Sequence, residues 1–483
     1  MERPAYSPER EREYLARGWW RDDDVLGVWL DRHARERPDA PALIFNHELT
    51  SWKNLKHRVL RTAAGLQRKG VGKGDVVAIQ LPNTPELIVA HLAINSLGAV
   101  LCTIHMPYRG AEIETILGHS GARLFLNSAS LVNELEGDAM NEKRPMPDAR
   151  DPFLLLYTSG TTASPKGVPH AYRTMLGNSR NGAREHRLSA SDRILCAAPL
   201  SHLYGLYSLH CAWAVGATTV LLPAFKADEL ALLVEREKPT ALWCGPAHVA
   251  ACRAAGLFDK HDWSSLELAI VSGSLAPPEL IRFFSTKIPG CKVTQLWGMT
   301  EIQAGLYTRP GDPLEMSATT AGRRSPGTEI RLEDNEIQVR GPLVFSGYYE
   351  SNENPFTEDG WFRTGDLAEP QGEYFRITGR SKDLINRGGV KFNPADVEML
   401  LDSHPRILQS AIVPMADPIL GEKACAFVVL RDKTDSLRLE DLIDYLLKKN
   451  IAKNKLPERL VVVLDMPLTP TRKIIKSRLK LPE

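Results

Sequence analysis

The sequence predicts an α/β protein in which helices cover both faces of mostly parallel sheets. Strand and helix patterns alternate from about Asp39 to Thr240, which is typical of doubly wound sheets. Two windows, Leu87–Tyr108 and Ile194–Phe225, contain no Asp, Glu, Lys or Arg, as expected of buried helix and strand units. The length of 483 residues suggests about three folding units rather than a single core.

The predicted elements of the large N-terminal part form two doubly wound α/β subdomains followed by a β-rich module. Short strands are expected at 76–80, 154–158 and 218–222, and helices at 85–97 and 227–237. From about residue 325 to 380 the pattern changes to short alternating strands with Gly and Pro breaks. Strands are expected there at 329–332 and 336–340.

The last hundred residues carry a complete set of elements of their own. Strands are expected at 411–413, 424–430 and 460–464, and helices at 394–401 and 439–448. These are enough for a small independent α+β domain. We therefore divide the chain into an N-terminal domain of residues 1–381 and a C-terminal domain of residues 382–483, with a hinge at Lys382.

The charge balance excludes a protein that binds nucleic acid through a global field. Lys and Arg together number 60 and Asp and Glu 59, so any anion binding must be local. Polar residues and glycine interrupt both uncharged windows, so no membrane span is expected. The seven cysteines are scattered without C-x-x-C spacing and are interpreted as core residues in a reducing compartment. The N-terminus lacks the apolar core of a signal peptide, so a cytoplasmic location is expected.

The most informative segment is Phe153–Gly167, in which the pattern of a buried strand changes abruptly into hydroxyls, glycines and one lysine. Backbone N–H groups, hydroxyls and an ammonium group there could converge on the phosphates of a nucleotide. The segment is not the common P-loop, because Gly167 follows the lysine where that motif needs Ser or Thr. A polar surface turn is the alternative interpretation. The predicted contacts are Thr158, Ser159, Gly160, Thr161, Thr162 and Lys166.

Four further segments accompany this loop. Leu296–Glu301 is expected to end a strand and begin a helix, and Trp361–Asp366 is expected to be a turn that ends in a carboxylate. Gly379–Pro394 is the interdomain stretch, and Leu468–Ile475 lies near the C-terminus. In this order, the five segments resemble those of the adenylate-forming superfamily, which contains acyl-CoA synthetases, nonribosomal adenylation domains and beetle luciferases. The similarity covers nearly the whole chain.

The resemblance implies an enzyme that joins a carboxylic acid to AMP, releases pyrophosphate and passes the acyl group to a thiol. Because the attack brings two anions together, positive charge and oriented donors must offset their repulsion. The resemblance assigns this task to Lys473, with Thr300 on the α-phosphate, Glu301 on Mg2+ and His202 closing the acyl site. Alternatively, Lys473 is a solvated lysine in a basic tail, Thr300 only caps a helix, and His202 is a core histidine with satisfied hydrogen bonds.

The resemblance also implies the nucleotide contacts. Asp366 would accept both ribose hydroxyls, with an ordinary Asx turn as the alternative, and Arg380 would meet ribose or phosphate oxygens. No Asp, Glu, Lys or Arg lies in the segments expected to line the adenine and acyl pockets, so an uncharged acyl body is expected. The expected residues of these segments are Gly273, Ser274, Trp297, Gly298 and Met299.

By the same resemblance, the C-terminal domain is a mobile lid over an AMP-binding N-terminal domain. Rotation at Lys382 would withdraw the tail lysine and present Gly388, Gly389 and Lys391 to the thiol of coenzyme A. A thiol attacks an acyl-adenylate readily, so no strong base is needed.

The expected activity is therefore that of an AMP-forming acid–CoA ligase that uses ATP, Mg2+ and coenzyme A. One alternative is an acyl- or aryl-AMP ligase that loads the phosphopantetheine of a carrier protein. A second is a non-catalytic module that binds acyl-adenylates. The second is motivated by three departures from the family pattern, which are Ala163 and Arg472 in place of common glycines and the turn Ser274–Ala276. The sequence does not identify the acid.

Overall fold

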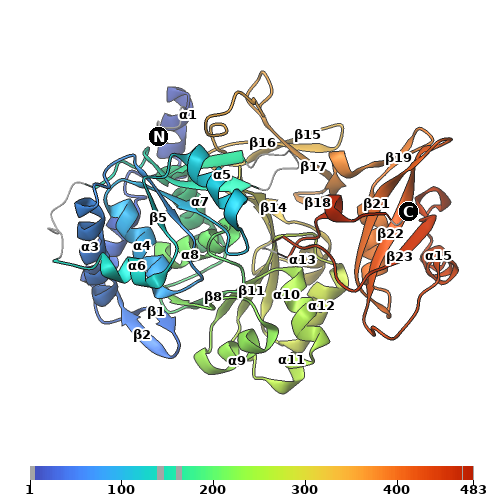
Figure 1. The fold of residues 1–483 in the computed structure, drawn as a ribbon, viewed down its shortest axis with the longest axis horizontal. Coiled ribbons are helices and arrows are strands. Elements are labelled where there is room, and N and C mark those ends of the chain that lie inside the picture. The colour runs from blue at the N-terminus through green and yellow to red at the C-terminus, as the bar shows by residue number, and fades with distance from the viewer. Residues whose placement is uncertain (1–5, 139–145, 159–165, 470–471, 482–483) are drawn as a thin grey trace.

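The computed structural model describes residues 6–138, 146–158, 166–469 and 472–481, and Figure 1 shows how their elements are arranged. The largest sheet has nine strands, of which those from β12 to β1 are parallel and those at the two edges antiparallel. In spatial order they are β14 (Arg323–Arg324), β13 (Gln303–Tyr307), β12 (Lys292–Met299), β11 (Leu268–Val271), β10 (Ala241–Cys244), β8 (Arg193–Cys196), β9 (Thr218–Val220), β1 (Pro41–Phe45) and β2 (Glu48–Ser51).

A second sheet of five strands lies in the same N-terminal part. Four of its strands are parallel, and the fifth, β7, returns antiparallel beside β6. The order is β5 (Leu124–Leu126), β3 (Val76–Ile79), β4 (Val100–Thr103), β6 (Pro152–Thr158) and β7 (Lys166–Ala171).

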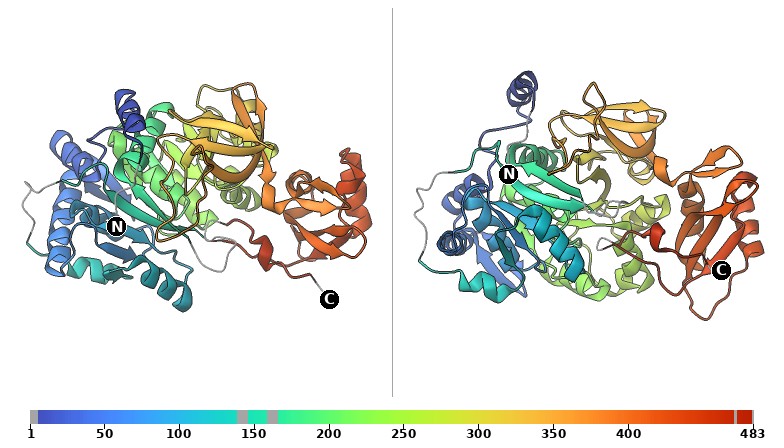
Figure 2. Two further views of the ribbon diagram at one scale, coloured as in Figure 1. Left: turned by 90° about the horizontal axis from the view of Figure 1, so that it is seen from above. Right: turned by 45° about the horizontal axis from the view of Figure 1, so that its top comes forward.

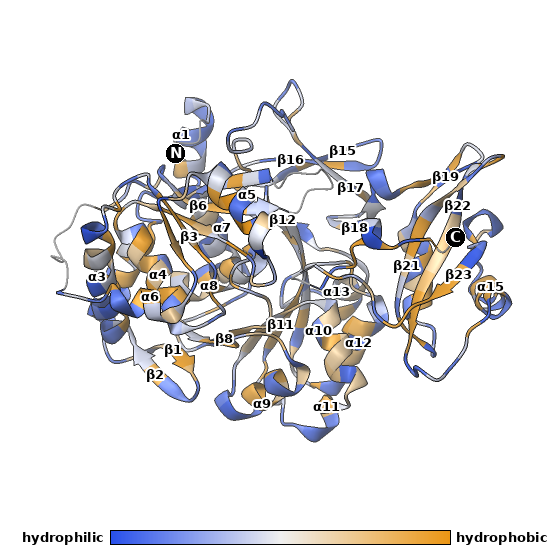
Figure 3. Ribbon diagram, viewed as in Figure 1, coloured by the Kyte–Doolittle hydropathy of each residue, from blue (hydrophilic) through white to orange (hydrophobic). Residues whose placement is uncertain are grey.

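One hydrophobic core joins both sheets through the helices between them, because apolar residues of both sheets and of these helices pack together. The helices are α2 (Leu26–Glu36), α3 (Trp52–Arg68), α4 (Pro85–Ser96), α6 (Ala129–Glu134), α7 (Tyr172–Glu185) and α8 (Leu203–Val215). In Figure 3, α4 and many strands of the two sheets are largely orange, whereas α3 carries both colours. Both uncharged windows of the sequence lie in this region, as α4 with β4 and as β8, α8 and β9.

Separate cores cover the outer faces of the two sheets. The outer face of the large sheet packs against α9 (Ala227–Glu237), α10 (Pro246–Ala254), α11 (Leu257–Lys260) and α12 (Pro278–Lys287). The outer face of the five-stranded sheet packs against α5 (Gly110–Ser120). The remaining helices of this part are α1 (Pro8–Ala16) and α13 (Leu314–Thr319). Helices on both faces confirm the predicted doubly wound α/β class.

A four-stranded antiparallel sheet follows the large sheet and shares an apolar core with residues of β7, β12 and β13. It consists of β15 (Glu329–Glu333), β16 (Glu336–Arg340), β17 (Phe362–Gln371) and β18 (Tyr374–Arg380). Trp361–Asp366 is not the predicted turn, because it runs into β17, whose Asp366 pairs with Arg380 of β18. This pairing sets the two charged residues side by side.

The C-terminal elements form another sheet with an apolar core on each face. Its strands are β20 (Val390–Phe392), β19 (Ile385–Arg387), β22 (Gly421–Leu430), β21 (Ile407–Asp417) and β23 (Arg459–Val462). The helices are α14 (Pro394–Asp402) and α15 (Leu439–Lys448), with short 3₁₀ turns at η1 (Ser381–Asp383), η2 (Lys453–Lys455) and η3 (Lys476–Arg478). In both views of Figure 2 the last, red segment leaves this sheet and reaches toward the N-terminal part.

Candidate active site

Several of the predicted site residues lie in loops that leave the same edge of the large sheet. β9 and β10 flank β8, so the order of parallel strands reverses at β8. In open α/β sheets, ligands bind outside the carboxyl ends of the strands at such a reversal. The segments that follow the carboxyl ends here contain His202 after β8, Gly273 and Ser274 after β11, and Thr300 after β12. The topology therefore gathers segments that are far apart in the sequence.

Asp366 is held from two sides. The indole N–H of Trp297 donates to its Oδ2 over 2.8 Å, and the guanidinium Nε of Arg380 lies 2.8 Å from its Oδ1. The carboxylate belongs to a residue that is only 6% exposed. A buried carboxylate with fixed oxygens is suited to bind a pair of neighbouring hydroxyl groups, because it can accept a hydrogen bond from each.

Lys473 comes from the C-terminal tail and interacts electrostatically with this carboxylate. A tight turn presents it, in which the N–H of Thr469 donates to Lys473 O over 2.8 Å and the N–H of Lys473 donates to Thr469 Oγ1 over 3.0 Å. Burial lowers the pKa of Lys473 to about 8; the Arg380 cation lowers this pKa further, while Asp366 raises it. The ammonium group thus lies within electrostatic range of both members of the Asp366–Arg380 pair.

His202 caps the N-terminus of α8. Its Nδ1 accepts from the backbone N–H of Tyr204 over 3.2 Å, and its ring stacks on His105 with centroids 6.0 Å apart. Burial lowers the pKa of His202, and His105 and Lys473 lower it further, so this imidazole is neutral at pH 7. An uncharged histidine near Lys473 provides a polar wall without adding charge.

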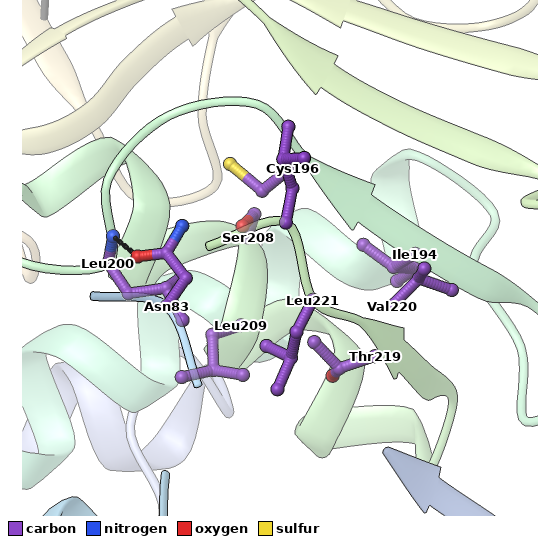
Figure 4. Close-up of a pocket in the computed structure, with 10 residues that line it drawn as sticks. Asn83, Ile194, Cys196, Leu200, Ser208, Leu209, Thr219, Val220 and Leu221 are labelled. Atoms are coloured by element: carbon purple, nitrogen blue, oxygen red, sulfur yellow. Dashed lines mark hydrogen bonds between the residues drawn. The ribbon is translucent and has the colours of Figure 1, made fainter. Parts of the chain in front are cut away.

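The loop that leads to His202 is fixed by one buried amide. The side chain of Asn83 accepts from the backbone N–H of Leu200 over 2.8 Å and donates to Ala198 O over 3.2 Å. Figure 4 shows Asn83 and Leu200 beside a small internal cavity of about 10 Å³ between β8, α8 and β9. None of the predicted site residues lines that cavity, which has room for about one water molecule.

Thr300 and Glu301 do not begin a helix, and that prediction is wrong. They form the turn of a hairpin between β12 and β13, so Thr300 has no helix to cap. The hairpin is tight at Gly298, where an added Cβ would lie 1.7 Å from Gln303 O. Only glycine allows this approach.

Glu301 is a buried carboxylate with a hydroxyl partner. Tyr348 donates its phenolic O–H to Glu301 Oε1 over 3.1 Å, and burial raises the pKa of Glu301 while Arg380 and Lys166 lower it. Among the described residues no group of three His, Cys, Asp or Glu is placed to hold a metal. Mg2+ bound with nucleotide phosphates needs only one or two carboxylates, so Glu301 fits that ion.

Lys166 opens β7 and pairs across the sheet with Thr158. Its ammonium lies 2.6 Å from the carboxylate of Glu353 and 4.9 Å from the ring centroid of Tyr348. Tyr348 therefore contacts both Lys166 and Glu301. The other predicted phosphate contacts, Ser159, Gly160, Thr161 and Thr162, lie outside the described residues.

Other predicted residues lie at exposed positions. Gly388 and Gly389 form the tip of the β19–β20 hairpin and Lys391 follows them in β20, all three exposed to solvent. Lys382 is exposed in η1 directly after β18. Sequence reasoning missed Asn83, Tyr348 and Glu353, and no spacing in the sequence links them to their partners.

Comparison with known proteins assigns this chain to a family. Residues 30–349 match the model of the AMP-binding enzymes, and residues 396–473 match that of the C-terminal domain of AMP-binding enzymes. The chain therefore belongs to the AMP-binding enzyme family, within the adenylate-forming superfamily. These are ligases that activate acids as adenylates.

Several relatives match along almost the whole chain. It is 28% identical to the medium-chain fatty-acid–CoA ligase of Escherichia coli, with 98% of this chain and 93% of the relative covered. It is 31% identical to the indoleacetate–CoA ligase of Aromatoleum aromaticum, with 94% and 97% covered. The o-succinylbenzoate–CoA synthetase of Bacillus subtilis, solved with its acyl-adenylate, superposes with a TM-score of 0.83 at 27% identity and 94% and 98% coverage.

The described residues contain no helix with the length and apolar character of a membrane span.

Proposed function

We propose that this protein is an AMP-forming acid–CoA ligase, which activates a carboxylic acid with ATP and transfers the acyl group to coenzyme A. The observation that carries the proposal is the Asp366–Arg380 ion pair beside the carboxyl edge of the large sheet, with Lys473 in electrostatic range of both residues. In this reading Asp366 binds the ribose hydroxyls, and the two cations face the α-phosphate and the attacking carboxylate. The relatives named as CoA ligases support the choice of acceptor.

The adenylation step needs charge compensation more than covalent help from the protein. A pKa of about 8 leaves most Lys473 molecules charged at neutral pH, and bound anions would favour the charged form further. As a compact charge on a flexible stem, the lysine can bridge the two reacting anions and then leave. Arg380 stays on β18 and stabilises charge that remains on the phosphate.

Mg2+ would be held by Glu301, whose orientation Tyr348 fixes. When bound, the ion neutralises negative charge on the triphosphate. Thr300 and Lys166 supply a hydroxyl and an ammonium group for the phosphates, together with Thr158 and the predicted loop residues. Trp297, Gly298 and Met299 end β12 beside the same point, where they would border the nucleotide and the acyl group.

For the second step we propose that residues 382–483 move as a unit about Lys382. The described C-terminal residues have cores of their own, which supports rotation without unfolding. The rotation would remove Lys473 and bring Gly388, Gly389 and Lys391 to the acyl-adenylate. Because coenzyme A is bulky and anionic, an exposed glycine hairpin followed by a lysine suits its pantetheine arm and phosphates.

The acid itself is proposed to carry an uncharged acyl body. The ring pair His105 and His202 is neutral, because burial lowers the pKa of His105 to about 4 and that of His202 also falls. A cytoplasmic location fits the supply of ATP and coenzyme A. All seven cysteines are buried and unpaired, which fits a reducing compartment.

A second candidate function is an acyl- or aryl-AMP ligase that loads a carrier protein. The chain is also 29% identical, over 98% of its length and 96% of the relative's, to the 2,3-dihydroxybenzoate–AMP ligase of Bacillus subtilis. The third possibility, a module that binds acyl-adenylates without catalysis, is opposed by the retention of Lys166, Glu301, Asp366, Arg380 and Lys473.

A carboxylic-acid screen distinguishes the three. Purified protein is incubated with ATP, Mg2+ and a broad acid panel, alone, with coenzyme A, or with phosphopantetheinylated carrier protein. We expect pyrophosphate release with one acid class and acyl-CoA by mass spectrometry. Acyl transfer to the carrier with negligible transfer to coenzyme A would favour the second candidate. Release of no pyrophosphate with any acid would favour the binding module.

A further inference from the structure

The residue before Lys473 shapes the turn that presents it. Arg472 has φ of +64°, in the left-handed region that glycine occupies most easily. Its N–H donates to Thr469 O over 2.8 Å, which closes the turn. An arginine at this position costs more backbone free energy than a glycine, so its side chain is expected to make a contact that offsets this cost.

The Arg472 side chain contacts the N-terminal part of the protein. Its guanidinium carbon lies 5.4 Å from the ring centroid of Phe225, which lies between β9 and α9. The Phe225 ring in turn packs 4.3 Å from the ring of His248 in α10. His248 is fixed, because its Nδ1 accepts from the backbone N–H of Gly245 over 2.9 Å. Phe225 and His248 therefore form a rigid aromatic platform beneath the guanidinium.

The platform stays uncharged at neutral pH. Burial lowers the pKa of His248 to about 4, and the Arg472 cation lowers it further. A neutral ring surface attracts a guanidinium through its π face, whereas an imidazolium would repel it.

We infer that Arg472 is a positioning residue, which holds the Lys473 turn in the adenylating arrangement by resting its guanidinium on Phe225. This inference depends on the proposed function. The contact joins the tail to the N-terminal part only while Lys473 faces the Asp366–Arg380 pair. It therefore favours adenylation and must break before acyl transfer.

Arg472 is exposed, so its cation–π contact is of the weaker, solvated kind. Its loss should lower the ratio of closed to open molecules by about two- to fivefold.

The test compares Arg472→Ala, Phe225→Leu, the double variant and Arg472→Lys. Lys433→Ala is the matched control, because it removes an exposed positive charge from the same C-terminal part. Two rates are measured for each protein, acid-dependent pyrophosphate exchange and acyl transfer from preformed acyl-AMP. The closed fraction is measured by energy transfer between dyes attached to Leu49→Cys and Ile419→Cys. These positions are 66% and 89% exposed. All native cysteines are buried, so the dyes react at the two introduced ones.

We expect Arg472→Ala and Phe225→Leu each to lower the closed-to-open ratio about two- to fivefold and to slow exchange, with acyl transfer unchanged or faster. The double variant should lose no more than the worse single variant, Arg472→Lys should restore part of the loss, and the control should match the parent. Equal slowing of both reactions, additive losses, or an unchanged closed fraction would overturn the inference. If even the parent protein exchanges no pyrophosphate, the proposed function fails, and the dye measurement still decides whether Arg472 and Phe225 hold the tail closed.

Discussion

Replacing Trp297 with Phe tests how Asp366 is positioned. The substitution keeps an aromatic ring in the core but removes the indole N–H that donates to Asp366 Oδ2 over 2.8 Å. Arg380 would still pair with Oδ1. One oxygen of the carboxylate would thus lose its protein donor at a residue that is 6% exposed.

The size of the effect follows from the kind of bond. A hydrogen bond to a charged group contributes about 1.5–3 kcal/mol, which corresponds to about a 10- to 150-fold change in an equilibrium constant. If the indole holds the carboxylate in the orientation that binds ribose, we expect the KM for ATP to rise at least tenfold. The KM for the acid should change little, because Asp366 is assigned to the nucleotide.

The assay is acid-dependent pyrophosphate exchange at varied ATP, with ATP binding by calorimetry as a second measurement. Trp361→Phe is the control, because Trp361 and Trp297 are both 8% exposed and Trp361 instead contacts Arg331 and Arg340. An ATP KM within twofold of the parent, or an equal rise in both variants, would refute the reasoning.

Three further predictions concern the charged groups of the site. Because the pKa of Lys473 is lowered to about 8, its ammonium is lost as the pH rises through that value. Above it, kcat/KM for exchange should fall about tenfold for each further pH unit. A flat profile to pH 10 would contradict the assignment. Glu353→Gln removes the carboxylate that lies 2.6 Å from Lys166 and competes with phosphate, so the KM for ATP should fall about two- to fivefold, and a rise would count against this competition. Tyr348→Phe removes the donor to Glu301 and should raise the Mg2+ concentration needed for half-maximal exchange by about tenfold; an unchanged requirement would separate Glu301 from the metal.

The sequence was sufficient for elements with a strong local pattern. The predicted boundaries of 227–237, 336–340 and 439–448 agree with α9, β16 and α15. α15 succeeds because its apolar residues, among them the buried Leu442 and Leu446, recur at helical spacing. The two uncharged windows were correctly predicted to be buried, because an apolar unit of that length must lie between other layers.

The hairpin after β12 shows where local reasoning failed. Thr300 and Glu301 after a glycine fit the start of a helix, yet all five residues of β13 are buried, so no alternation marked the following strand. The contact of Trp297 with Asp366 and that of Lys166 with Glu353 join residues 69 and 187 positions apart. Such partners are brought together by the sheets, and a single sequence contains no local signal for them.

The most direct measurement for the proposed activity is carboxylic-acid-dependent exchange of pyrophosphate into ATP, made on the parent protein, Lys473→Ala and Lys476→Ala. Lys476 is the matched control, because it belongs to the same tail but pairs with Glu398 over 2.7 Å. We predict a loss of about 100- to 1,000-fold for Lys473→Ala and almost none for Lys476→Ala. Exchange that survives unchanged without the Lys473 ammonium would contradict the account.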